Sequence, residues 1–82
     1  MDKLDYAVLD LMVEREATTK MRALTLKTVI REFNVKKDTL YRRILKLVKL
    51  KHLEKGIKES RECTYYITEQ GEKLLMGAMH ER

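Results

Sequence analysis

The residues of this sequence that could do chemistry are mostly cations, and they are concentrated in one segment. Residues 36–58 contain nine Lys and Arg against two acids, so the segment carries a charge of +7. The rest of the chain carries −2, and residues 1–19 alone carry −3. A basic segment of this kind is the expected footprint of a surface that binds a polyanion. The alternative is a solvated, Lys-rich helix face that keeps the protein soluble.

Side chains suited to catalysis or metal binding are scarce. The chain has one cysteine, Cys63, and two histidines, His52 and His80. One cysteine cannot form an internal disulfide, and these three residues lack the spacing of a zinc site. The sequence also lacks a Gly-rich phosphate loop, a nucleophile elbow and carboxylates paired in an apolar setting. We therefore expect no enzyme activity, no cofactor and no metal, and we interpret Cys63 as a small, half-buried residue rather than a redox switch.

Length and composition predict one small domain over residues 1–82. The chain has 82 residues, a mass of 9.8 kDa and a pI near 9.4. A chain of this size buries only about 60% of the surface that its unfolded form exposes, which leaves no room for a second domain. Its apolar stretches are at most three or four residues long, and acids stand near the start, where a signal peptide would have cations. We expect a cytoplasmic protein without membrane contact.

The first element should be a helix over about residues 3–17 with two apolar faces. One face has the spacing i, i+3, i+4, i+7 and i+8 of a stripe that packs on a core, and consists of Leu4, Ala7, Val8, Leu11 and Met12. A second set lies roughly opposite at 100° per residue, and consists of Tyr6, Leu9, Val13 and Ala17. A surface helix of a monomer does not need both faces, so the second set is predicted to face a partner.

A helix-turn-helix is predicted over about residues 25–51. Thr25 is a candidate N-cap for a helix from about 26 to 32, and Asn34 is expected to adopt the left-handed conformation that ends it. The next helix should run from Lys36 or Lys37 to at least Lys49. Its buried stripe is predicted to consist of Leu40, Ile44, Leu47 and Val48. Four polar residues should line its solvent side, where a groove could receive them: Thr39, Arg42, Arg43 and Lys46.

The last third of the chain predicts a β-hairpin, or wing, over about residues 53–67, followed by a helix over about 69–80. The segment 63–68 is rich in β-branched and aromatic residues, which favours a strand. Lys58 and Arg61 lie near the expected tip. Thr68 is a candidate N-cap, and a short strand is also possible around residues 22–24. The fold class is therefore mainly α with a small hairpin, α+β, in the order helix, possible strand, helix, helix, strand, strand, helix.

This order resembles a winged helix-turn-helix, and two motifs resemble the PadR-like and MarR-like bacterial transcription regulators in particular. TLYRRILKL at residues 39–47, with Tyr41, resembles the recognition helix of the PadR-like family. TYYITEQGEKLL at residues 64–75 resembles the strand-to-helix joint that these regulators share. Family members commonly have glycine where this chain has Lys51. We therefore expect the recognition helix to end without glycine and Gly56 to lie within the wing.

The resemblance implies a small homodimeric regulator that binds double-stranded DNA with its recognition helix in the major groove. We expect a repressor, because so small a domain can block polymerase without an activation surface. Contacts to bases and phosphates are expected from Arg42, Arg43 and Lys46, and phosphate contacts from Lys36 and Lys37. Thr39 could contact a thymine methyl or a phosphate. Tyr41 could hydrogen-bond a phosphate or lie at the core edge, and the wing could reach DNA through Lys58 and Arg61. The predicted dimer interface consists of Tyr6, Leu9, Val13, Leu75, Met76 and Met79.

A second interpretation comes from another functional class. The same basic face could dock an acidic protein, as in an adaptor, a phage or plasmid antirepressor or a segregation factor. An RNA-binding function is a less supported interpretation than these two. The chain has one Phe and no Trp, and its tyrosines are assigned largely to the core, so no aromatic surface for stacking bases is evident. No residue argues for a small-molecule effector.

Overall fold

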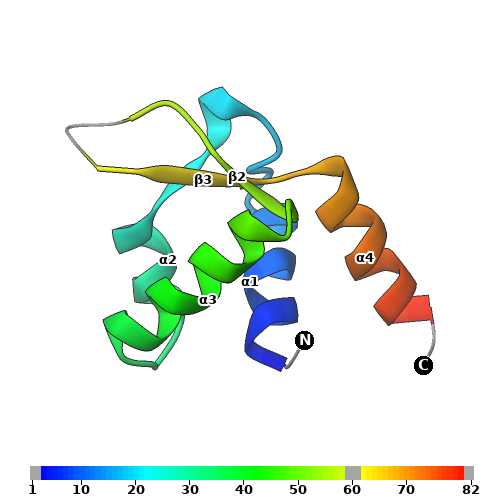
Figure 1. The fold of residues 1–82 in the computed structure, drawn as a ribbon, viewed down its shortest axis with the longest axis horizontal. Helices are drawn as coiled ribbons and strands as arrows, with labels where there is room; N and C mark the ends of the chain where they lie inside the picture. The colour runs from blue at the N-terminus through cyan, green and yellow to red at the C-terminus, as the bar shows by residue number, and fades with distance from the viewer. Residues whose placement is uncertain (1–2, 59–61, 81–82) are drawn as a thin grey trace.

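The computed structural model describes residues 3–58 and 62–80, which form four helices around a small three-stranded sheet (Figure 1). The elements in chain order are α1 Lys3–Glu14, the 3-10 turn η1 Lys20–Arg22, β1 Leu24–Thr25, α2 Leu26–Glu32, α3 Lys37–Lys49, β2 Leu53–Lys55, β3 Thr64–Ile67 and α4 Glu69–His80. This is the predicted winged helix: α2 and α3 form the helix-turn-helix, and β2 and β3 form the wing.

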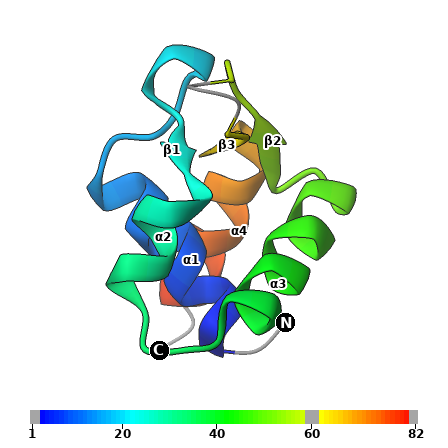
Figure 2. The same cartoon turned by 90° about the vertical axis from the view of Figure 1, so that its left-hand side faces the viewer.

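The sheet is antiparallel, with β3 between β1 and β2. Tyr65 pairs with Leu24 on one side and with Lys55 on the other, so this short strand ties the wing to the start of α2. Tyr65 and Ile67 are fully buried and share one face of the strand. Figure 2 shows α3 and β2 on the same side of the molecule, with β1 and α2 on the other.

Helix α1 occupies the middle of the helical layer, in contact with both α3 and α4. Residues on more than one face of α1 are therefore buried. Leu9 and Ala17, which the sequence assigned to a partner-facing side, have no exposed surface. The prediction of a separate partner face was wrong for these two residues, because α4 of the same chain packs against α1. Leu75 of α4 is also in this core.

Two helices end in a left-handed residue that is not glycine. After α3, the amide of Lys51 donates to Val48 O at 3.0 Å and that of His52 to Leu47 O at 2.9 Å, which is the Schellman pattern. Lys51 has φ 66°, at the position where the resembling regulators have glycine. The helix thus ends without glycine, as expected, and Gly56 follows β2 directly.

The same pattern ends α1 at Glu14, three residues earlier than predicted, with Glu16 at φ 57°. Its neighbour Ala17 donates to Met12 O at 2.8 Å.

The prediction that Asn34 ends α2 in a left-handed conformation was wrong. Helix α2 ends at Glu32, and its C-cap residue Phe33 has an extended backbone with φ −124° and ψ 139°. In the described part of the chain, the non-glycine residues with positive φ are Glu16 and Lys51.

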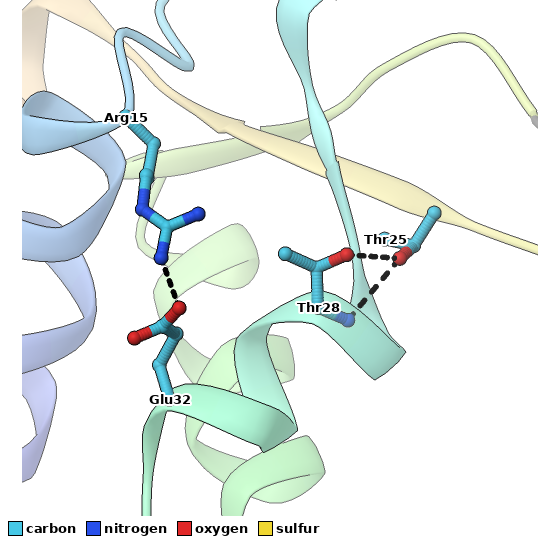
Figure 3. Close-up of polar contacts among 4 residues, drawn as sticks. All are labelled: Arg15, Thr25, Thr28 and Glu32. Carbon is cyan, nitrogen blue, oxygen red and sulfur yellow. Dashed lines mark hydrogen bonds and ion pairs between the residues drawn. The ribbon is translucent and has the colours of Figure 1, made fainter.

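The predicted N-caps of α2 and α4 are confirmed. Thr25 Oγ1 accepts from the Thr28 amide at 3.2 Å and pairs with the Thr28 hydroxyl at 3.0 Å (Figure 3). Figure 3 also shows an ion pair between Arg15, after α1, and Glu32, the last residue of α2. This exposed pair links the end of α2 to the segment after α1, so that side-chain contacts stand at both ends of α2.

The joint between β3 and α4 is packed tightly on the end of α3. Thr68 Oγ1 accepts from the Gly71 amide at 3.1 Å and donates to Lys51 O at 2.6 Å. At Gly71 the first turn of α4 passes so close to α3 that a Cβ would lie 2.3 Å from His52 O. Glycine is therefore required at this position of the predicted joint motif, and the contact sets the position of α4 relative to α3.

Candidate nucleic-acid interface

The outward face of α3 lies opposite its buried stripe of Leu40, Ile44 and Leu47. At 100° per residue, the side chains that point directly away from this stripe are spaced i, i+4, i+7 and i+11. All four are exposed, and they are Asp38, Arg42, Leu45 and Lys49. Among the described residues, no carboxylate lies within ion-pair distance of Arg42 or Lys49. The line therefore presents Arg42 and Lys49 on either side of an apolar residue, with Asp38 one turn before Arg42.

Leu45 and Lys49 were not among the predicted site residues. The sequence analysis placed the polar face one step around the helix, on Thr39, Arg42, Arg43 and Lys46. A helical wheel centred on the three fully buried residues would have found them, because Val48, assigned to the buried stripe, is only partly buried. Including Val48 rotated the expected outward direction toward Arg43.

The flank of α3 that faces α1 contains Arg43 and Lys46. Both cations reach the carboxylate of Asp5 in α1, which has no exposed surface. Lys46 Nζ lies 3.4 Å and Arg43 Nη1 3.7 Å from Asp5 Oδ2. Two of the three cations expected to enter the groove are thus paired with a buried carboxylate of the same chain, although both side chains are partly exposed.

The opposite flank of α3 faces the wing, and a cavity of about 330 Å³ lies between them. Its lining includes Lys37 and Tyr41 from α3 and Cys63 and Tyr65 from the β3 segment. Burial, together with the neighbouring Cys63 and Tyr41, raises the pKa of Tyr65 to about 12, so its phenol stays neutral. Tyr41 is 40% exposed, at the edge of the core rather than within it. Its hydroxyl group remains a candidate for a phosphate contact.

The start of α3 presents further cations. Lys36 is the N-cap residue with extended backbone, and its side chain makes no capping bond. Lys36, Lys37 and Thr39 are all exposed. Together with Arg42 and Lys49 on the outward line, these two lysines at the start of the helix give four exposed cations on α3 and its N-cap. This set is named the α3 cation face below: Lys36, Lys37, Arg42 and Lys49.

The wing contributes Lys55 and Lys58, both exposed. Arg61, expected at the wing tip, lies outside the described residues. On β3, Tyr66 donates its hydroxyl to Glu54 Oε2 at 2.5 Å, and this bond raises the pKa of Tyr66. Glu54 and Tyr66 therefore satisfy each other across the wing strands, and their bond holds β2 against β3 next to α3.

Of the predicted dimer residues, Leu9 and Leu75 belong to the core of this chain. Val13 is 40% and Met76 57% exposed, and Tyr6 is partly buried. The side chain of Met79 lies outside the described part of the structure. Among the described side chains of the predicted interface, those with exposed surface are Tyr6, Val13 and Met76.

Metal-binding clusters and membrane-spanning helices are absent from the described ranges, 3–58 and 62–80. No group of three or more His, Cys, Asp and Glu side chains is arranged to hold a metal ion there. No helix in those ranges has both the length and the apolar character to cross a bilayer.

Comparison with known proteins gives no matching family model. A DNA-binding protein TubR from a Clostridium botulinum C phage is 27% identical over 79 residues, which are 96% of this chain and 98% of that protein. The structure of TubR from Bacillus megaterium pBM400 has a TM-score of 0.87 and 19% identity, and covers 98% of this chain and 88% of that one. The solution structure of a DNA-binding TubR fragment from Clostridium botulinum has a TM-score of 0.76 and 26% identity, over 95% of this chain and 96% of the fragment. In fold the chain is a winged helix similar to TubR, and in sequence it resembles a protein named for binding DNA.

Proposed function

We propose that this chain binds double-stranded DNA specifically, as a homodimer, with α3 in the major groove. The observation that carries the proposal is the α3 cation face, which is exposed and lies beside the wing on one side of the molecule. Phosphates would be bound by Lys36, Lys37 and Lys49, and bases would be read by Arg42, whose fork of donors matches guanine. The names of the TubR relatives support DNA as the ligand.

Leu45 adds an apolar contact in the middle of this face. An exposed leucine between Arg42 and Lys49 on the outward line could pack on a thymine methyl group. Arg42 and Leu45 would then read adjacent base pairs, while the lysines set the register. Two copies related by a twofold axis would read a pseudo-palindrome with half-sites about one helical turn apart. Occupation of promoter DNA would make the protein a repressor of the PadR-like or MarR-like kind that its two motifs resemble.

The test is fluorescence anisotropy of a labelled mixed-sequence duplex, titrated at salt from about 50 to 200 mM. Each neutralised phosphate contributes about −0.9 to the slope of log affinity against log salt. We expect Lys49→Ala to lower the affinity severalfold and to make the slope less negative by about 0.9, the contribution of one phosphate. Lys73→Ala is the matched control, because it removes the same exposed side chain from a helix at the far end of the molecule (Figure 1). Equal effects of the two variants would place the DNA elsewhere.

Specific readout is tested on a selected operator. Arg42→Ala should reduce the preference for operator over mixed-sequence duplex, because a bidentate contact to guanine contributes about 1–3 kcal/mol of discrimination. Lys49→Ala should lower the affinity for both duplexes by the same factor. A preference that survives Arg42→Ala would exclude α3 as the element that reads the bases.

A protein-docking adaptor is the second candidate, and Leu45 and Leu50 favour it. Leu45 is exposed in the basic helix α3, at 38%, and Leu50 at its C-cap, at 43%. Large apolar side chains among cations would suit an acidic protein with apolar anchors. The anisotropy titration distinguishes the two functions. If the protein does not bind any duplex at 50 mM salt but remains folded, the adaptor becomes the leading candidate.

A further inference from the structure

Asp5 is the one carboxylate among the described residues that is both fully buried and paired with α3. It lies on α1 with no exposed surface, and Lys46 and Arg43 approach its Oδ2 at 3.4 and 3.7 Å. Aspartate is almost never fully buried without charged or hydrogen-bonding partners. The pairing across the α1–α3 contact therefore requires an explanation beyond surface solubility.

The energetics of the pair are asymmetric. A carboxylate removed from water needs its cations in place, because an uncompensated buried charge is strongly unfavourable. The side chains of Lys46 and Arg43, in contrast, are 47% and 34% exposed. If either cation turned outward to follow a phosphate, Asp5 would lose part of its compensation. DNA must therefore compete with Asp5 for both side chains, whereas Arg42 and Lys49 face no such competitor among the described residues.

We infer that Asp5 is a positioning residue that sets the edge of the DNA-binding face. It directs Lys46 and Arg43 toward α1 and keeps their charge from the phosphates, so that contact with DNA is concentrated on the α3 cation face. This inference rests on the proposed function. It predicts that the native sequence binds non-specific DNA less tightly than the number of cations on α3 would indicate.

The experiment compares Asp5→Asn with Asp10→Asn in the anisotropy titration. Both substitutions are on α1 and raise the net charge by one, but Asp10 is exposed on the helix surface. We expect Asp5→Asn to raise the affinity for a mixed-sequence duplex at least threefold above Asp10→Asn at about 50 mM salt. The salt slope should steepen by about 0.9 for each released cation that neutralises a phosphate. Circular dichroism verifies that both variants are folded.

A second pair of variants first tests the inference in the native background, where the buried carboxylate is unchanged. In the native background, Lys46→Ala should change the affinity and the slope less than Lys49→Ala does, although both lysines are exposed cations of α3. In the Asp5→Asn background, Lys46→Ala should reverse a large part of the gained affinity. The comparison in the native background remains valid even if Asp5→Asn is poorly folded, because it needs no change at Asp5.

The outcomes separate the inference from the function on which it rests. If the native protein binds DNA but Asp5→Asn equals Asp10→Asn in affinity and slope, or Lys46→Ala equals Lys49→Ala, the role of Asp5 is refuted and DNA binding stands. If the native protein binds no duplex at low salt, the proposed function fails and the role of Asp5 fails with it.

Discussion

At the scale of single residues, Glu16 and Lys51 hold backbone conformations that their side chains disfavour. Both lie at the first position after a Schellman-type helix end, with φ of 57° and 66°. An L-residue with a Cβ pays about 1–2 kcal/mol for this conformation, whereas glycine does not. The chain thus accepts strain at the end of α3, directly before the wing.

Lys51→Gly should therefore stabilise the protein. Relief of the strain outweighs the extra chain entropy of glycine in the unfolded state, about 0.4–1 kcal/mol, which leaves a gain of about 0.5–1 kcal/mol. Urea unfolding followed by circular dichroism measures it. Lys73→Gly, in the interior of α4, is the control and should lose about 1 kcal/mol. A loss of stability in Lys51→Gly would mean that the lysine side chain contributes more than the strain costs.

At the scale of elements, the position of α4 depends on one close approach. Gly71 lies against the backbone of His52, and Thr68 both caps α4 and bonds the Lys51 carbonyl. The end of α3 and the start of α4 are thereby fixed to each other within a few residues. Since α4 covers α1, this joint also completes the core around Leu9 and Leu75.

Two glycines of the same helix test the joint. Gly71→Ala would place a Cβ 2.3 Å from His52 O and 2.8 Å from Ile67 Cγ1, so backbone must move. We expect it to destabilise the protein by about 1–3 kcal/mol. Gly77→Ala meets no atom within 4 Å and should instead stabilise by about 0.5–1 kcal/mol through helix propensity. Thermal unfolding of the two variants measures both, and a shift of the same sign in each would contradict the close-approach argument.

At the scale of the whole molecule, the α3 cation face and the exposed residues of the predicted dimer interface lie on different helices. The α3 cation face lies on the side of the wing, while Val13 and Met76 are exposed on α1 and α4. A homodimer through α1 and α4 would bury the apolar side chains and leave both copies of α3 available to one DNA duplex.

Met76→Glu should convert the dimer to a monomer, because a carboxylate would be buried against its own copy across the twofold axis. Sedimentation at tens of micromolar measures the change. Met21→Glu is the matched control, since Met21 is 83% exposed on η1, away from α1 and α4, and should leave the dimer intact. A native protein that sediments as a monomer at this concentration would refute the dimer itself.

Most of the secondary structure of this protein could be predicted from patterns that act over short stretches of the chain. The helical spacing of Leu40, Ile44 and Leu47, the capping threonines Thr25 and Thr68 and the β-branched run at residues 64–67 each act over a few neighbours along the chain. Their effects can be read from composition and spacing, so the order of elements and the winged-helix class followed. The bounds of α2 and α3 followed as well.

The tertiary structure alone decided what the polar and second-face residues do. Leu9 is buried because α4 covers it, and Lys46 and Arg43 turn toward Asp5, which is far away in sequence but lies beneath α3. No local pattern links residue 5 to residue 46, since their meeting depends on how whole helices pack. For the same reason the cations that are available to DNA could be identified only once α1 was in place beside α3.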